Sequence, residues 1–132
     1  MAKLRVVVEE LDKFIEGVMK KIALDVVANL ASPPSEGGTP IDTGWASANW
    51  IPYIGSPSRA TAGERPKQGT ASRADQEAGS SRVAAGYKRG QTITIANNVP
   101  YIVTLNEGSS AQAPSGFVQK AIFKSVKETA TR

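Results

Sequence analysis

Two carboxylates in distinctive surroundings are the residues of this chain most suggestive of catalysis. Asp42 lies in the turn-forming run TPIDTG, and Glu107 stands just before Gly108 in NNVPYIVTLNEGSS. Two acids whose pKa values are pushed apart can supply a general acid and a base, as in glycoside hydrolysis. Nothing in the sequence brings these acids together, and each has a simpler role in forming or ending a local turn. We therefore expect no enzyme activity and assign no catalytic residue.

The residue types that are missing exclude other kinds of chemistry. The 132 residues include no His and no Cys, which removes the commonest general base, thiolate chemistry and zinc sites of the usual kind. No glycine-rich loop has the spacing of a phosphate-binding or dinucleotide-binding motif. We therefore expect neither a metal nor a cofactor.

Basic residues gather in the second part of the chain and could contact a partner or DNA. Through Ser58 there are 5 Lys or Arg against 7 Asp or Glu, and from Arg59 onward there are 11 against 5. Such asymmetry can mark a nucleic-acid face, although charge alone favours an ordinary solvated surface. The candidate contact residues are Arg59, Arg65, Lys67, Lys88 and Arg89.

The two tryptophans admit two interpretations. Trp45 and Trp50 could act as stacking platforms for bases. Packing in the core or in a subunit interface is the more common role of such large side chains, and we favour it here.

A long amphipathic helix is predicted at the start of the chain. Apolar residues recur with helical spacing from Leu11 to Leu30, and charged residues occupy the other face. Pro33 and Pro34 should end a helix of about 22 residues. An apolar stripe of this kind usually packs across a sheet.

The middle of the chain predicts a strand and then a long loop. The residues from Trp45 to Ile54 are assigned to a strand, in which Pro52 points to an edge or a bulge. The segment from Ser56 to Ser72 has no large apolar residue and cannot offset its own ordering entropy. We expect a long, flexible polar loop there.

The second half predicts a weak helix, a strand and a terminal helix. The weak helix lies in RADQEAGSSRVAAGYKRG, with its small-residue stripe at Ala74, Ala78, Val83, Ala84 and Tyr87. QTITIAN alternates cleanly and is rich in β-branched residues, which is typical of a strand. Ser115 is the expected N-cap of the terminal helix. Its expected buried stripe is Phe117, Val118, Ala121, Ile122 and Val126.

The segment between the strand and the terminal helix can be read as strand or helix. Strand propensity favours YIVTL as β structure. A short helix is favoured by an Asn cap at Asn97 or Asn98, by Pro100 in the first turn and by Gly108 just past the end. In the helical reading, which we prefer, Tyr101 and Leu105 face the core and Glu107 lies at the helix end.

These elements, in this order, resemble the tail-completion proteins of long-tailed bacteriophages, which are minor tail proteins that join head and tail at the neck. The matching motifs are the Pro-x-Asp-Thr-Gly turn of Pro40–Gly44 and the block from Asn97 through Tyr101 and Glu107 to Gly108. QAPSGFV, which leads into the terminal helix, also fits. The resemblance covers about Leu11 to Ile122, and it leaves the Ser56–Ser72 loop without a counterpart.

The resemblance implies an α+β fold in which a small antiparallel sheet packs against a long N-terminal and a C-terminal helix. It implies that Asp42, Thr43 and Gly44 set a turn, that Tyr101 anchors the short helix and that Glu107 and Gly108 end it. It also implies a structural role in a ring, typically of six copies, that contacts the tail terminator, the tail tube and the head-side connector.

The expected location is the virion, after synthesis in the host cytoplasm. No run of residues predicts a signal sequence or a membrane span, so no membrane contact is expected. The length predicts a single domain over residues 1–132. The sequence shows no clear exposed apolar patch, so a monomer in isolation is compatible with it. A tail terminator, a head-side adaptor and a small basic nucleic-acid-binding protein are the alternative functions.

Overall fold

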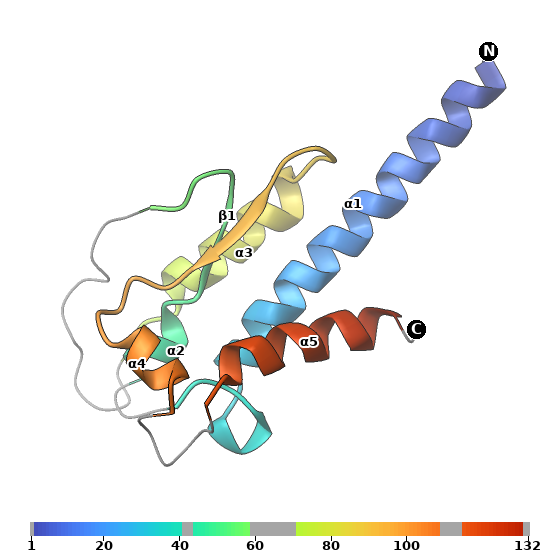
Figure 1. Cartoon of the computed structure of the whole chain (residues 1–132). Coiled ribbons are helices and arrows are strands. Elements are labelled where there is room, and N and C mark those ends of the chain that lie inside the picture. The colour runs from blue at the N-terminus through green and yellow to red at the C-terminus, as the bar shows by residue number, and fades with distance from the viewer. Residues whose placement is uncertain (1, 41–43, 59–70, 109–114, 131–132) are drawn as a thin grey trace.

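The computed structural model describes residues 2–40, 44–58, 71–108 and 115–130, with side chains described from Val8 onward in the first helix. The described chain confirms the α+β class: it has a small antiparallel sheet, a long helix near the N-terminus and another helix near the C-terminus (Figure 1). The elements are α1 (Ala2–Ala31), the 3-10 turn η1 (Pro34–Glu36), α2 (Trp45–Ala48), β1 (Ile51–Ile54), α3 (Ala74–Gly86), β2 (Ile93–Ala96), α4 (Ile102–Asn106) and α5 (Phe117–Ala130).

Helix α1 is longer than the sequence pattern predicted. It spans 30 residues instead of about 22, because it also includes the residues before Leu11, most of which are good helix formers. At a rise of about 1.5 Å per residue the helix is roughly 45 Å long. Figure 1 shows its N-terminal half extending beyond the other elements, whereas its C-terminal half lies beside α5.

The C-terminal end of α1 is fixed by hydrogen bonds to the residues that follow it. The backbone N–H and the hydroxyl of Thr39 both donate to the Leu30 carbonyl, at 3.0 and 2.7 Å. The Trp50 indole N–H donates to the Thr39 hydroxyl at 2.8 Å. Gly38 is required in this turn, since an added Cβ would lie 1.7 Å from the Ser32 carbonyl oxygen. Trp50 is thereby held in the core, as the packing interpretation predicted.

The strand predicted from Trp45 to Ile54 is wrong over its first part. Residues Trp45–Ala48 form the short helix α2, and the strand begins only at Ile51. Ala46, Ser47 and Ala48 are consecutive and all buried, which a strand with one exposed face does not allow. The small side chains let this turn pack closely, and the Asn49 side-chain amide closes it by donating to the Trp45 carbonyl at 2.7 Å.

The strands β1 and β2 pair antiparallel, with Ile51 opposite Ala96 and Ile54 opposite Ile93. In the described part of the chain they form a two-stranded sheet, so Pro52 is on an edge strand as predicted. Helix α3 packs on β1 through Gly79, where an added Cβ would lie 2.9 Å from the Pro52 carbonyl oxygen.

The helix predicted around α3 is confirmed, but its expected buried stripe is confirmed only at Val83 and Tyr87. Ala74, Ala78 and Ala84 are exposed, whereas Gln76, Gly79 and Val83 face the body. Gln76 is buried because its amide donates to the carbonyls of Ser47 and Trp50, at 3.0 and 3.1 Å.

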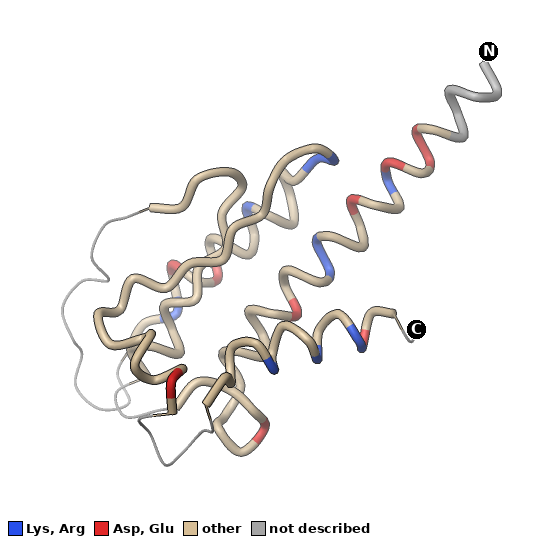
Figure 2. Tube along the Cα trace, viewed as in Figure 1, with Lys and Arg blue, Asp and Glu red and all other residues tan. Residues whose placement is uncertain are grey.

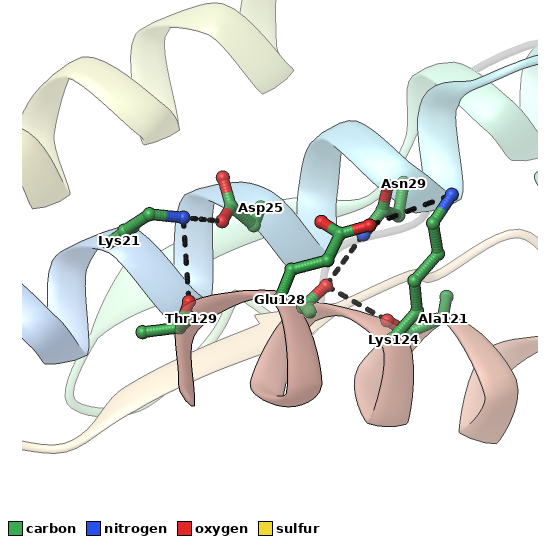
Figure 3. Close-up of polar contacts among 8 residues, drawn as sticks. Lys21, Asp25, Asn29, Ala121, Lys124, Glu128 and Thr129 are labelled. Carbon is green, nitrogen blue, oxygen red and sulfur yellow. Dashed lines mark hydrogen bonds and ion pairs between the residues drawn. The ribbon is translucent and has the colours of Figure 1, made fainter. Parts of the chain in front are cut away.

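Helix α5 packs on the C-terminal half of α1 through a face that includes the predicted Phe117 and Ala121 but not the predicted Ile122 and Val126. Phe117, Ala121 and Ser125 are buried, but Ile122 and Val126 are 44% and 46% exposed. Asn29 donates its side-chain N–H to the Ser125 hydroxyl at 2.8 Å, and Lys21 reaches Thr129 at 3.4 Å (Figure 3). The Asn29–Ser125 hydrogen bond lies within the contact between the two helices, whereas Ile122 and Val126 remain partly exposed to solvent.

The start of α5 also differs from the prediction. The Gly116 carbonyl accepts the first intrahelical bond, from the Lys120 N–H at 3.0 Å. Gly116, rather than Ser115, therefore takes the cap position.

Candidate interaction surfaces

Gly44, the last residue of the predicted Pro40–Gly44 turn, stands directly before α2. Gly44 has φ +83° and precedes the first residue of that helix, so the turn uses a conformation that glycine adopts without strain. This agrees with the turn role predicted for Gly44. Asp42 and Thr43 lie outside the described residues.

The block from Asn97 to Gly108 contains a short helix, α4, as preferred over a strand. The ring of Tyr101 packs against that of Trp45 with centroids 5.8 Å apart, and Ile102 and Leu105 contact the core cluster. Gly108 has φ +96° and its N–H donates to the Leu105 carbonyl at 3.1 Å. Glu107 is exposed at the C-cap position. These contacts give Tyr101 and Gly108 roles in the local fold.

The asparagines before α4 do not cap it as predicted. Tyr101 takes the N-cap position, without a side-chain cap bond. Asn97 instead ties the loop to α2, since its amide donates to the Ala46 carbonyl at 2.8 Å and its side-chain oxygen accepts from the Val99 N–H at 3.0 Å. Asn98 donates to the Ser58 carbonyl at 2.8 Å.

The predicted basic contact residues are only partly within the described structure. Lys88 is exposed in the turn between α3 and β2. Arg89 forms an ion pair with Asp12 on α1, and its backbone N–H donates to the Glu16 carboxylate at 3.1 Å. Arg89 therefore ties this turn to α1. Arg59, Arg65 and Lys67 lie outside the described residues.

The N-terminal half of α1 exposes an apolar stripe. Val8, Leu11 and Phe14 are 45%, 49% and 68% exposed, and we call these three residues the N-terminal stripe. The spacing of three residues places them along one side of the helix. The expectation of no clear exposed apolar patch is therefore wrong. The sequence correctly predicted helical spacing of these apolar residues. They are not buried because this half of α1 extends beyond the other described elements.

An apolar groove opens where α1, β2 and α5 meet, and its α1 residues follow the stripe along the helix. Its volume is about 330 Å³. Met19 and Ile122, which line it, are 40% and 44% exposed, so its mouth is accessible. We call it the α1–α5 groove. Its lining is Met19, Ile22, Ala23, Val26, Leu30, Trp50, Ile93, Ile95, Val118 and Ile122.

Charge is distributed differently on the exposed faces of α1 and α5. On α5 the exposed lysines Lys120, Lys124 and Lys127 surround Phe123, which is 71% exposed. On α1 the segment from Val8 to Val18 carries four carboxylates and one lysine, and its Glu9 and Glu10 are exposed. Figure 2 shows the acidic positions toward the N-terminal half of α1 and the basic positions along α5.

Within the ranges that the structure describes, no helix combines the length and the apolarity needed to cross a membrane. Those same ranges contain no group of three or more acidic residues placed to hold a metal ion. Comparison with family models, with curated proteins and with solved structures found no match to this chain.

Proposed function

We propose that this chain is a structural protein of the neck of a long-tailed bacteriophage, where copies form a ring that completes the tail and joins it to the head. The ring is proposed to contain six copies, to contact the tail terminator, the tail tube and the head-side connector, and to surround the DNA that passes through the channel. The protein has no catalytic role in this proposal, and its residues serve folding and assembly.

The ordered set of motifs from Pro40 to Ile122 carries the proposal. The described structure is compatible with it: Gly44 has a left-handed conformation, α4 ends at Asn106 with Gly108 just past its C-cap, and the terminal helix follows. The exposed apolar side chains of α1 and α5 add support, because monomeric proteins rarely leave large contiguous apolar patches in water. Contact with further copies or with neck proteins would remove these apolar side chains from water, which is favourable.

Deletion of the gene from the phage that encodes this chain tests the proposal. We expect filled heads and separate tails in electron micrographs, with joining restored when the protein is supplied in trans. A complementing copy with Val103→Glu, on the exposed part of α4, serves as a control for expression and folding. Normal yields of infectious particles from the deletion would contradict the proposal. A map of the joined particle would separate tail completion from a terminator or a head-side adaptor by the position of the ring.

A small basic nucleic-acid-binding protein is the second candidate, and the exposed lysines of α5 favour it. Binding through these residues would be non-specific and would weaken steeply with salt, because each contacted phosphate releases counterions. Fluorescence anisotropy of the purified protein with a duplex at low salt tests this function. Binding that is lost in the triple Lys120→Gln, Lys124→Gln, Lys127→Gln variant would support it, and no binding by the unmodified chain at low salt would exclude it.

A further inference from the structure

We infer that the outer edge of β2, where it borders the α1–α5 groove, binds an extended segment of another protein whose apolar side chains alternate along the strand. The bound segment becomes a third strand of the sheet and places every second side chain in the groove. The inference goes beyond the proposed function, and it concerns a contact that the isolated chain can make.

The pairing of the two strands identifies the main-chain groups of β2 that point away from β1. The Gly55 N–H donates to the Thr92 carbonyl at 2.7 Å, and these two residues continue the register of the strands. Hydrogen-bonded pairs alternate with non-hydrogen-bonded pairs in an antiparallel ladder, so Ile93 and Ile95 form no ladder bond to β1. Pro52, which has no N–H, stands opposite Ile95, as this alternation requires. Within the described residues, the outward N–H and C=O groups of Ile93 and Ile95 have no hydrogen-bond partner.

The opposite edge of the sheet is closed, which leaves β2 as the edge that can accept a strand. Pro52 has no N–H to donate there, and α3 packs so closely that a Cβ at Gly79 would lie 2.9 Å from the Pro52 carbonyl oxygen. The four residues of β2 include neither a proline nor a charged side chain, which are common protections of an exposed edge. An edge without such protection is a template for pairing with another chain.

The α1–α5 groove determines which side chains the added strand should carry. Ile93 and Ile95 line the groove from β2, and its mouth is open at Met19 and Ile122, which are 40% and 44% exposed. A strand added about 4.8 Å from β2 places the side chains opposite Ile93 and Ile95 on the same face of the sheet. That face borders the groove, so these alternate side chains should be apolar. The residues between them point the other way and can be polar.

The same groups favour an extended ligand over a helix and a foreign strand over a segment of this chain. A helix bonds its own main-chain groups and would leave those of Ile93 and Ile95 unpaired. In this sequence the run QTITIAN forms β2 itself, and the run WIPYIG forms β1. The polar segment from Ser56 to Ser72 has no large apolar residue to place in the groove. We therefore assign the added strand to a different protein.

Binding of a synthetic strand peptide tests the inference. The probe is a fluorescein-labelled octapeptide in which valine alternates with threonine and lysine, and the control has the same composition with its valines grouped at one end. In fluorescence anisotropy with the unmodified chain, we expect the alternating peptide to bind and the control to bind at least tenfold more weakly. Two further peptides carry N-methyl groups, one on every valine nitrogen and the other on every intervening nitrogen. Because alternate N–H groups of a strand point to opposite edges, one of these two should bind at least tenfold more weakly and the other should retain its affinity.

A matched pair of variants tests the same bond from the side of the protein. Ile93→Pro and Ile93→Ala both remove the isoleucine side chain, but only the proline removes the outward N–H, and neither removes a ladder bond to β1. Ile93→Pro should bind the alternating peptide at least tenfold more weakly than Ile93→Ala, with thermal melts by circular dichroism to confirm folding. If Ile93→Pro does not fold, hydrogen exchange of the unmodified chain replaces it. Addition of the peptide should then protect the amides of Ile93 and Ile95 and leave that of Thr94, which is already bonded to β1, unchanged.

Three results would overturn the inference. The first is no binding of the alternating peptide at millimolar concentration. The second is binding that neither pattern of N-methylation weakens, because the contact would then use side chains alone. The third is self-association of the unmodified chain that Ile93→Pro abolishes and Ile93→Ala retains, which would assign the edge to a second copy. None of these results bears on head–tail joining, which the gene deletion tests separately.

Discussion

The two halves of α1 carry the same kind of apolar pattern and have opposite environments. In the C-terminal half, Val26 and Leu30 are 5% and 1% exposed and belong to the core cluster with Trp50 and with Phe117 and Ala121 of α5. In the N-terminal half, Leu11 and Phe14 are 49% and 68% exposed. Figure 1 shows the cause, since the other elements lie against one half of the helix and the other half extends past them.

This difference shows that an apolar stripe alone does not identify the element that covers it. Helical periodicity identifies the face that will be buried when something covers it. It does not identify the covering partner, which can belong to the same chain or to another. In α1 the stripe of one half is covered by α5, and the stripe of the other half is presented to solvent in the single chain.

Substituting one leucine in each half should give the largest contrast. Leu30→Ala should lower the free energy of unfolding by about 2–5 kcal/mol, because it leaves a cavity in the core cluster. Leu11→Ala should change it by less than about 0.5 kcal/mol at low protein concentration, because half of that side chain already contacts water. Urea denaturation followed by circular dichroism measures both.

The comparison would fail if Leu11→Ala were as destabilising as Leu30→Ala in the dilute monomer. Such a result would mean that the N-terminal half of α1 is packed within its own chain. A loss that appears only at high protein concentration would instead point to burial of Leu11 in self-association.

Replacing a glycine by alanine should change the free energy of unfolding with opposite signs at a packed position in α3 and at an open position in α1. Gly79→Ala places a Cβ 2.9 Å from the Pro52 carbonyl oxygen, and overpacking of this kind typically costs about 1–3 kcal/mol. Gly17→Ala meets nothing within 4 Å and should stabilise the chain by about 0.5–1 kcal/mol through helix propensity. Melting temperatures of the two variants check the signs, and a stabilising Gly79→Ala would mean that α3 is more loosely packed on β1.

Local signals in the sequence predicted most of the elements, because each of these signals acts over a few residues. Pro33 and Pro34 follow the end of α1, the alternation in QTITIAN gives β2, and Gly108 ends α4. The strand assigned to Trp45–Ala48 failed because small buried residues fit a tight helical turn as well as a pleated strand. The turn is then selected by contacts with residues far along the chain, such as Asn97 and Gln76.

The interaction surfaces were harder to predict, although one signal was present. A compact chain of 132 residues has a radius of gyration of about 14 Å, so a helix of about 45 Å cannot be covered along its whole length. That argument requires the full length of α1, which the sequence pattern underestimated. The partial exposure of Ile122 and Val126 was not predictable from periodicity, because the Asn29–Ser125 hydrogen bond helps set the rotation of α5.

The smallest expected effect concerns the attachment of the uncovered half of α1 to the rest of the chain. Asp12 and Arg89 form an ion pair whose side chains are 38% and 50% exposed, so water and salt screen it strongly. A double-mutant cycle with Asp12→Asn and Arg89→Gln should give a coupling free energy of about 0.2–1 kcal/mol at low salt and less at high salt. Urea unfolding of the four proteins in the cycle measures it, with Lys88→Gln as the control in the same turn. A coupling that is larger, and that salt does not weaken, would show that the pair is shielded from water and that this half of α1 is covered more than its apolar stripe implies.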